Sequence, residues 1–539
     1  MSAMAPSNYD AAASSPVILQ SRPKQKAIGG DSRKKDSDED INDATTAQDA
    51  ADAEYYKDQE AQIDYDSRTS LASNSFTRKM LKLGVEELGV HPIPEKDRTD
   101  RHFYQVATLW ISMSVGLVPL SAGIVGTLTY GLSLRDASLT ILFFSMLTCI
   151  PVAYLSTLGP KTGLRQMVQA RYSFGLVGAS LPVILNLFTL GGYCMINSIL
   201  GAQTLAGVAG GDLSPSAGII VVCFISLAVS FMGYKALHIY EKYAWIPALI
   251  CLVIATGVGG KHFKSQFNAA PADAPTILSF GALIAGFIIP YAAISSDFFT
   301  YLSPEVSSRR VFLYTYAGLL VPTIPLMVLG AAIGAATPMV EAWTIADGQN
   351  HIGGILVAML EPAGGFGKFV AVLLALSVVG NIAATFYSIT LNCQVLLPLL
   401  VKVPRYVFSL IATAIIIPVA IVAADHFYDA LVNFLGLIAY WSSAYCGIVL
   451  VEHIAFRKRD RHAYKHSSWN KIRELPTGAA AISAGLLAVP VIVPSMYQVW
   501  YEGPIAKKTG DIAFELAFAV AALLYYPLRK LEIKVLGRL

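Results

Sequence analysis

Between residues 103 and 527 the chain consists of long apolar runs separated by short polar connections. Each run is close to the roughly 20 residues that an α-helix needs to cross the hydrocarbon core of a bilayer. We therefore predict an all-α, polytopic membrane protein with 12 transmembrane helices, embedded in a lipid bilayer. The predicted spans are 103–130, 136–157, 178–208, 217–234, 243–260, 277–301, 311–337, 365–391, 406–424, 429–451, 477–500 and 512–527.

The two ends of the chain lack this pattern. Residues 1–75 are rich in Ala, Ser, Asp and Lys and show no apolar period, so we predict that they are disordered. Residues 77–90 are more amphipathic and could form a short interfacial helix. The prediction divides the chain into a mostly disordered N-terminal tail (1–102), a twelve-helix core (103–527) and a short C-terminal tail (528–539).

Composition agrees with burial in a membrane. Of the 539 residues 54% are hydrophobic and only 14% are charged, whereas soluble proteins carry about 25% charged residues. This scarcity of charge excludes an ordinary soluble enzyme. The formal charge of +3 combines an acidic tail over residues 1–102, with a net charge of −5, and a remainder with a net charge of +8.

The basic residues predict the orientation of the spans. If the N-terminus is cytoplasmic, the inner loops hold 16 Lys and Arg and the outer loops hold 6, as the positive-inside rule requires. We therefore predict that both termini lie in the cytoplasm. The same topology explains the basic runs, which all lie in inner loops, better than a nucleic-acid partner does.

Two predicted spans are interrupted by helix-breaking residues. Span 1 contains Gly116 and Pro119, and span 6 contains Gly286 and Pro290. These spans are five apart, so they occupy matching positions in two five-helix halves. Paired broken helices are typical of inverted-repeat transporters, in which the freed backbone groups line a binding site. The alternative is that Gly and Pro only shape helix packing, as they often do in membranes.

Polar side chains are concentrated in spans 3 and 8. Tyr193 and Asn197 are four residues apart and share one helix face, and Asn381, Thr385 and Ser388 form a second stripe. A carboxamide offers a donor and an acceptor that match the edge of a planar heterocycle, and aromatic rings offer stacking faces. The alternative is that these groups bridge neighbouring helices, with about 0.6 kcal/mol for each bond.

One acidic residue lies inside the first ten spans. Asp297 is near the inner end of span 6, so we expect Arg309 and Arg310 to lie close to it. An intramembrane carboxylate is a candidate functional group, here as a gate, an ion pair or a proton relay. Glu452 and Glu515 stand at span ends and are predicted to be interfacial.

Motifs for catalysis and metal binding are missing from the sequence. There is no Walker loop, GxSxG or HExxH, which disfavours an ATP-driven pump and a membrane-embedded enzyme. The six cysteines all fall in apolar runs without a CxxC or Cys/His cluster, so we expect no metal site and no cofactor.

Several further segments form a recognisable set: Gly84–Asp100, Gly159–Met167, Ala170–Gly175, Asn433–Trp441, Glu452–His453 and Gly503–Ala506. Together they resemble fungal purine–cytosine permeases of the nucleobase:cation symporter-1 family. The resemblance implies a LeuT-like five-plus-five inverted repeat with alternating access. It also implies proton-coupled uptake of adenine, guanine, hypoxanthine or cytosine at the plasma membrane.

The resemblance also implies where a planar substrate binds. The aromatic residues of spans 3 and 6 fall on Tyr193 and Tyr291, where the family usually has Trp. The amide of span 3 is kept as Asn197, and the first Asn of span 8 is kept as Asn381. The two rings would sandwich the substrate, and the two amides would bind its edge.

Other positions depart from the family pattern. In span 8 the usual Pro has become Ala384 and the last Asn has become Thr385, which would adjust selectivity. The polar groups of span 1 fall on Ser114 and Ser121. A site built to bind one set of edge groups rejects analogues that leave them unpaired. The substrate could therefore be vitamin B6 (pyridoxine) or another small heterocycle instead of a base.

The long N-terminal tail leaves a rival of another class open. A transporter-like nutrient sensor could signal through such a tail without moving substrate. The tail could equally carry trafficking or ubiquitination signals, with exposed lysines as modification sites: Lys24, Lys26, Lys34 and Lys35.

Overall fold

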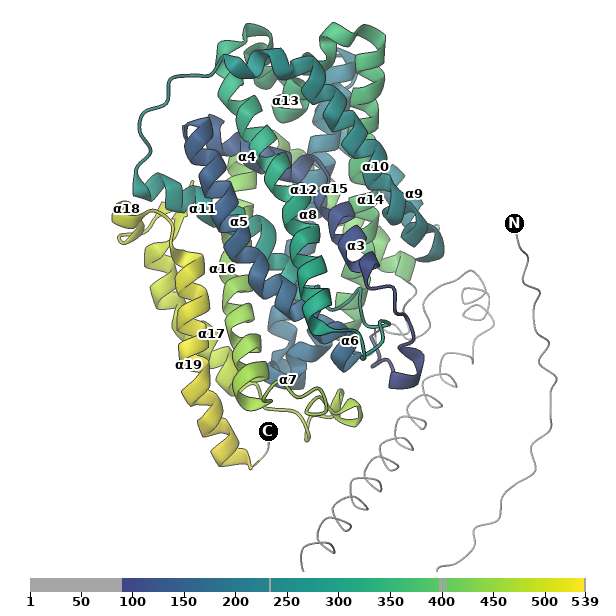
Figure 1. The fold of residues 1–539 in the computed structure, drawn as a ribbon, viewed down its shortest axis with the longest axis vertical. Helices are drawn as coiled ribbons and strands as arrows, with labels where there is room; N and C mark the ends of the chain where they lie inside the picture. The colour runs from purple at the N-terminus through teal and green to yellow at the C-terminus, as the bar shows by residue number, and fades with distance from the viewer. Residues whose placement is uncertain (1–89, 232–233, 397–399, 401–402, 404, 538–539) are drawn as a thin grey trace, which may run out of the picture. The chain divides into compact units, whose positions relative to one another are not determined.

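The apolar runs of the sequence are helical along most of their length (Figure 1). The structure is a computed structural model that describes residues 90–231, 234–396, 400, 403 and 405–537. Over the predicted spans, in order, the helices are α3 (Tyr104–Ser114) with α4 (Leu117–Leu128), α5 (Leu134–Ser156), α8 (Ser180–Ala209), α9 (Pro215–Ser230), α10 (Tyr234–Gly259), α11 (Ala274–Ile288) with η3 (Ile289–Ala293), α12 (Ser308–Ala336), α14 (Gly364–Leu396), α15 (Arg405–Ala424), α16 (Phe427–Val451), α17 (Ala479–Ser495) and α19 (Ala513–Leu536).

Shorter elements connect these helices. The only strands in the described residues form one antiparallel hairpin, so the fold is all-α apart from this pair. The connecting elements are η1 (Glu95–Asp97), α6 (Leu158–Thr162), α7 (Gln166–Gly178), η2 (Gly260–Lys264), η4 (Thr337–Met339), α13 (Glu341–Leu360), η5 (Glu361–Ala363), the π-helix η7 (Glu452–Phe456), η8 (His466–Ser468), β1 (Tyr497–Gln498), β2 (Tyr501–Glu502) and α18 (Ala506–Thr509).

Length and hydropathy identify most of the spans independently. Within the described ranges eight helices are long and apolar enough to cross a membrane, or nine when the bent pair α3 and α4 counts as one span. The helices α9 and α17 are apolar but shorter, and α19 carries charges in its second half. Each of the 12 predicted spans therefore corresponds to a helix.

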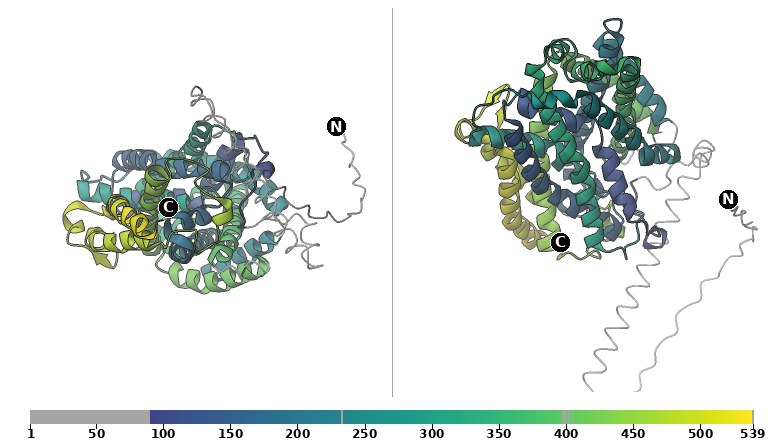
Figure 2. Two further views of the ribbon diagram at one scale, coloured as in Figure 1. Left: turned by 90° about the horizontal axis from the view of Figure 1, so that it is seen from below. Right: turned by 45° about the horizontal axis from the view of Figure 1, so that its top comes forward.

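The helices pack in pairs that fit a five-plus-five repeat (Figures 1 and 2). Span 1 contacts span 7 through α3, α4 and α12, and its counterpart, span 6, contacts span 2 through α11 and α5. Likewise α8 packs on α9 as α14 packs on α15. The central pairs, α8 with α14 and α5 with α12, join equivalent helices of the two halves.

Span 1 is broken where the sequence predicted it. The helix α3 ends at Ser114, Val115 and Gly116 are extended, and α4 leaves at an angle of 54°. Pro119 then lies in the first turn of α4, where its missing N–H costs no helical hydrogen bond.

Glycines allow α4 and α12 to pack closely. A Cβ atom on Gly123 would overlap the carbonyl oxygen of Met327, and one on Gly330 would overlap that of Leu120. In a bilayer no hydrophobic effect drives helices together, so they associate mainly through van der Waals packing. Small residues favour this association because they let the two backbones approach closely.

The predicted N-terminal tail ends earlier than residue 102. Val90 and Ile93 are buried, and the Ile93 N–H donates to the Gly163 carbonyl at 2.9 Å. Asp100 forms an isolated parallel bridge with Leu302, just beyond span 6. Residues 90–102 therefore belong to the helical core, whereas the predicted disorder of residues 1–75 lies outside the described residues, as does the predicted interfacial helix except for Val90.

Most of the predicted C-terminal tail, residues 528–539, belongs to a helix. The helix α19 continues to Leu536, and Arg529 is buried on it beside Glu452, with Nε and Oε2 3.1 Å apart. The Tyr525 hydroxyl donates to the same carboxylate at 2.8 Å. Glu452 lies at the end of α16, as expected, but its carboxylate is buried between two arginines and a tyrosine that compensate its charge.

Two connections hold structure that periodicity did not predict. The loop between spans 7 and 8 contains α13, which packs against α8 at the end of the bundle opposite α6 and α7 (Figure 1). Span 11 ends at Ser495 instead of residue 500, because the next residues form the hairpin. The last turn of α19 lies at the α7 end of the bundle (Figure 1), which fits the predicted common side of the basic loops and the end of this helix.

We expect Gly123→Ala to lower the thermal unfolding temperature of the detergent-purified protein. Its Cβ meets a fixed main-chain oxygen, and overpacking of this kind costs about 1–3 kcal/mol. The matched control is Gly191→Ala on α8, where a Cβ meets nothing within 4 Å. Equal melting temperatures for both variants would contradict the close packing of α4 on α12.

Candidate functional site

A cavity lies where the two broken spans meet spans 3 and 8. It brings together five of the seven predicted substrate residues: Tyr193, Asn197, Tyr291, Asn381 and Thr385. The other lining residues are Met113, Gly116, Val118, Pro119, Asn186, Thr189, Leu190, Phe287, Pro290, Ile294, Phe298, Ala384 and Ser388.

The break in span 6 supplies backbone acceptors to this site. The helix α11 ends at Ile288 and continues as the 3₁₀ turn η3. In a continuous helix the Gly286 carbonyl would accept a bond from the N–H of residue 290, but this residue is proline and has no N–H. The Tyr193 hydroxyl donates to the carbonyls of Gly286 and Phe287 instead, at 3.2 and 2.9 Å.

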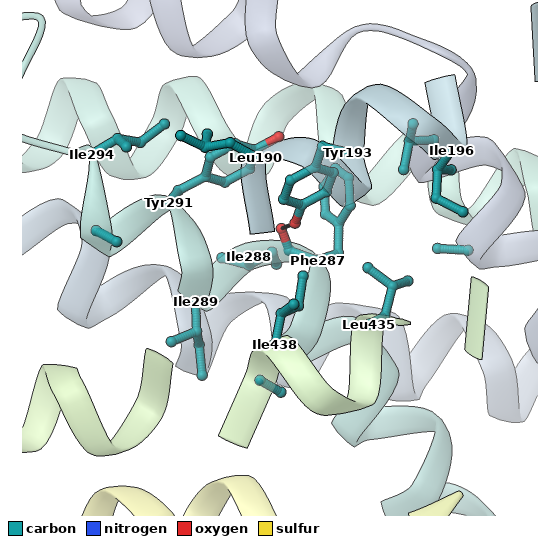
Figure 3. Close-up of a cluster of buried hydrophobic side chains, with 14 of the residues drawn as sticks. Leu190, Tyr193, Ile196, Phe287, Ile288, Ile289, Tyr291, Ile294, Leu435 and Ile438 are labelled. Carbon is teal, nitrogen blue, oxygen red and sulfur yellow. Dashed lines mark hydrogen bonds between the residues drawn. The ribbon is translucent and has the colours of Figure 1, made fainter. Parts of the chain in front are cut away.

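The two predicted aromatic residues face each other. Figure 3 shows Tyr193 and Tyr291 on neighbouring helices, with Leu435 and Ile438 of α16 beside them. Their rings are parallel within 3°, and the centroids are 6.1 Å apart. A planar ring between two faces needs about 3.5 Å on each side, so the pair must separate by at least about 1 Å to hold one.

Further aromatic rings hold the pair from outside. Trp110 of span 1 packs edge-on against Tyr291 at 5.6 Å, and Phe434 of span 10 packs edge-on against Tyr193 at 5.4 Å. Such contacts fix the planes of both tyrosines. Neither residue was predicted from the sequence, because an aromatic residue in an apolar run carries no signal that separates packing from a binding site.

Two polar side chains of the cavity donate to main-chain carbonyls of their own helices, and each keeps an oxygen that can accept from a ligand. Asn197 Nδ2 donates to the Tyr193 carbonyl at 2.8 Å, so its Oδ1 is the group that can accept from a substrate. Thr385 Oγ1 donates to the Asn381 carbonyl at 2.7 Å, which leaves the hydroxyl oxygen as an acceptor. Asn381 and Asn197 also line a second cavity, between α3, α10 and α14.

The two predicted serines of span 1 are not brought to either cavity. Ser114 is fully buried at the end of α3, and Ser121 donates to the Leu117 carbonyl at 2.7 Å within α4. The span 1 residues that line the first cavity are Met113, Gly116, Val118 and Pro119. The register across the break therefore differs from the expectation.

Asp297 lies outside the cavity, where it ties span 6 to the connection between spans 2 and 3. Its Oδ1 accepts from the Gln166 N–H at 2.6 Å, at the first turn of α7, where a carboxylate is favoured by the helix dipole. The Arg165 guanidinium bonds to the Asp297 main-chain carbonyl. The nearby cation is thus Arg165, not the expected Arg309 or Arg310, and the Arg310 guanidinium lies over the Phe103 ring.

Gln166 links this tie to a third span. Its Nε2 donates to the Tyr445 hydroxyl of α16 at 3.2 Å, and Ser295 Oγ donates to its Oε1 at 3.2 Å. Because all these groups are buried, they form one connected polar network on the predicted cytoplasmic side of the cavity. Such a network suits a structural tie or an inner gate.

Comparison with known proteins gives the family. Residues 92–502 match the sequence profile of a family described as permeases for cytosine/purines, uracil, thiamine and allantoin. The chain belongs to this permease family. It is therefore a membrane transporter and not an enzyme.

Individual permeases agree with this assignment. The chain is 35% identical to the purine-cytosine permease fcyB of Emericella nidulans over 467 residues, which cover 86% of this chain and 91% of the relative. It is 32% identical to the purine-cytosine permease FCY2 of Saccharomyces cerevisiae, covering 86% and 89%. The vitamin B6 transporter TPN1 of the same yeast is 27% identical, covering 86% and 90%.

Solved structures of a permease from the nucleobase-cation-symport-1 family share the fold. The closed conformation of Mhp1 with bromovinylhydantoin bound has a TM-score of 0.63 and 16% identity, covering 83% of this chain and 96% of Mhp1. Its inward-facing conformation has a TM-score of 0.65 and 15% identity, covering 84% and 95%. The predicted fold class is thus confirmed.

We expect Tyr193→Ala to weaken the binding of a planar substrate about 10- to 100-fold, since stacking on an aromatic ring is worth about 1–3 kcal/mol per base. Tyr193→Phe should keep the affinity within about threefold but lower the melting temperature, because the carbonyls of Gly286 and Phe287 lose their donor. Isothermal titration and thermal unfolding of purified protein measure both. An unchanged affinity in Tyr193→Ala would remove this ring from the site.

Proposed function

We propose that the chain is a secondary active symporter that imports a purine base or cytosine, coupled to protons. The observation that carries the proposal is the parallel pair of Tyr193 and Tyr291, which stands beside two amides at the break of span 6. Two stacking faces and a set of edge acceptors match the chemistry of a planar nitrogen heterocycle.

The relatives support the same class of substrate. Those with 32% identity or more are named purine-cytosine permeases, and each is covered over most of its length. The solved structure with a bound hydantoin derivative is a further case of a planar heterocycle in this fold. The plasma membrane, with both termini in the cytoplasm, is the location that we propose with this function.

Proton coupling is part of the proposal and rests on the resemblance to the family. No group of three or more His, Cys, Asp or Glu that could hold a metal ion occurs among the described residues. The buried acid Asp297 is engaged by Gln166 and lies next to Arg165, so we assign it to the inner gate rather than to proton transfer.

Vitamin B6 is the second candidate substrate. The two tyrosines offer smaller stacking faces than the usual tryptophans, and Thr385 replaces an amide at the edge of the cavity. Both changes alter the groups that select among heterocycles, and a relative named as a vitamin B6 transporter is similar over 86% of this chain. A sensor without transport, docking its partners through the N-terminal tail, is the alternative of another class.

Uptake in a fungal host that lacks base and pyridoxine transporters distinguishes these functions. We expect saturable uptake of radiolabelled adenine or cytosine that is faster at pH 5 than at pH 7, because protons drive it. Uptake of pyridoxine alone would favour the second candidate. Binding in isolated membranes without accumulation in cells would favour the sensor, and no saturable uptake of any base at either pH contradicts the proposal.

We expect Asn381→Ala to raise the KM for the transported base about 3- to 10-fold, the usual worth of one neutral hydrogen bond. A matched control is Thr390→Val, nine residues further along the same helix, where the hydroxyl bonds to the Phe386 carbonyl and lines neither cavity. Surface expression is measured for both variants by fluorescence of a C-terminal tag. An unchanged KM with normal expression would remove Asn381 from the site.

A further inference from the structure

Three polar groups of spans 3 and 8 form a chain of hydrogen bonds beside the cavity. Asn392 Nδ2 donates to the Ser388 carbonyl at 2.8 Å, and Asn186 Nδ2 donates to Asn392 Oδ1 at 3.0 Å. Asn186 is 1% exposed and Asn392 is 2% exposed. The substrate positions carried over from the family resemblance do not include either amide.

The main-chain carbonyl of Ser388 fixes the direction of these hydrogen bonds. A main-chain carbonyl can only accept, so Asn392 must turn its Nδ2 toward Ser388 and its Oδ1 toward Asn186. Asn186 must then present its own Nδ2 to Asn392. Rotating either amide by half a turn would bring two acceptors or two donors together. The Oδ1 atom of Asn186 is therefore an acceptor held in a fixed place.

This acceptor has no hydrogen-bond partner within the described part of the chain. Asn186 nevertheless lines the cavity that holds the tyrosine pair. A buried amide oxygen without a donor is rare, because it has lost its water without gaining a replacement. A ligand that brings a donor into the cavity would restore the missing bond.

The position of Asn186 complements that of Asn197. Asn186 precedes Tyr193 by seven residues, which is two helical turns or about 10 Å, and therefore lies on the same face of α8. Asn197 follows Tyr193 by one turn. The stacking ring thus has an amide acceptor toward each side of the membrane, and Asn186 is the one toward the predicted cytoplasmic side.

We propose that Asn186 Oδ1 accepts a hydrogen bond from an N–H group of the transported base, on the predicted cytoplasmic side of the tyrosine pair. The inference rests on the proposed function, since purine bases and cytosine carry ring N–H or exocyclic amine donors. It makes Asn186 a determinant of specificity, because a base that lacks this donor leaves the oxygen unpaired.

The test compares ligands in which methyl groups replace either the ring N–H or the exocyclic N–H donors. Adenine, 9-methyladenine and N6,N6-dimethyladenine are titrated into purified wild-type protein and into Asn186→Leu. If Asn186 accepts from the exocyclic amine, wild type should bind adenine about tenfold more tightly than N6,N6-dimethyladenine. If it accepts from the ring N–H, 9-methyladenine should be the weaker ligand by the same factor. Asn186→Leu should lose about tenfold in adenine affinity and bind the weaker analogue as wild type does.

The control is Thr204→Val on the same helix. Its hydroxyl is buried, bonds to the Leu200 carbonyl and lines neither cavity, so this variant should bind all three ligands as wild type does. If Asn186→Leu does not fold, Asn186→Ser replaces it, because serine withdraws the acceptor while it keeps a small polar group.

The remaining outcomes overturn the inference. An equal loss of affinity for all three ligands would show that Asn186 only supports the packing of α8 on α14. Unchanged affinities would show that its oxygen is satisfied without the substrate, for example by a bound water. If wild type binds neither adenine nor cytosine, the proposed function itself fails, and this result is separate because it does not depend on the variant.

Discussion

The site depends on one missing hydrogen bond in the middle of span 6. Pro290 cannot donate to the Gly286 carbonyl, and the bilayer core holds no water to take its place. The hydroxyl of Tyr193, a side chain from span 3, donates its single hydrogen to the neighbouring carbonyls of Gly286 and Phe287 instead. One proline thus ends the helix α11, provides a polar wall for the cavity and fixes the ring on which we expect the substrate to stack.

The same requirement accounts for the polar network on the predicted cytoplasmic side. The first turn of α7 leaves unpaired N–H groups, and Asp297 accepts one of them from Gln166. Arg165 and Tyr445 extend the network to neighbouring segments. The break of span 6 and the first turn of α7 therefore both find hydrogen-bond partners on other segments of the chain.

Much of the architecture could be predicted from the sequence, because apolar runs and helix breakers act over short distances. The broken spans, the 12 helical segments and the meeting of Tyr193 with Tyr291 and Asn381 are all present in the structure. The family assignment is confirmed by the match over residues 92–502.

Other features depend on contacts that no local pattern encodes. The serines of span 1 do not line the cavity, and the extended residues Val115 and Gly116 separate the helical segments that carry them. Arg165 reaches Asp297 from more than a hundred residues away, whereas the guanidinium of Arg310, which is nearer in sequence, lies over the Phe103 ring. The orientation of the Asn186 amide, and with it the position of its buried oxygen, depends on Asn392, which lies 206 residues further along the chain.

The most direct test of the central claim is the separation of the two tyrosine rings in an experimental structure with a base bound. The account predicts adenine or cytosine between Tyr193 and Tyr291, with the ring planes about 7 Å apart. A structure in which the rings keep their present centroid distance of 6.1 Å while the base binds elsewhere would contradict it.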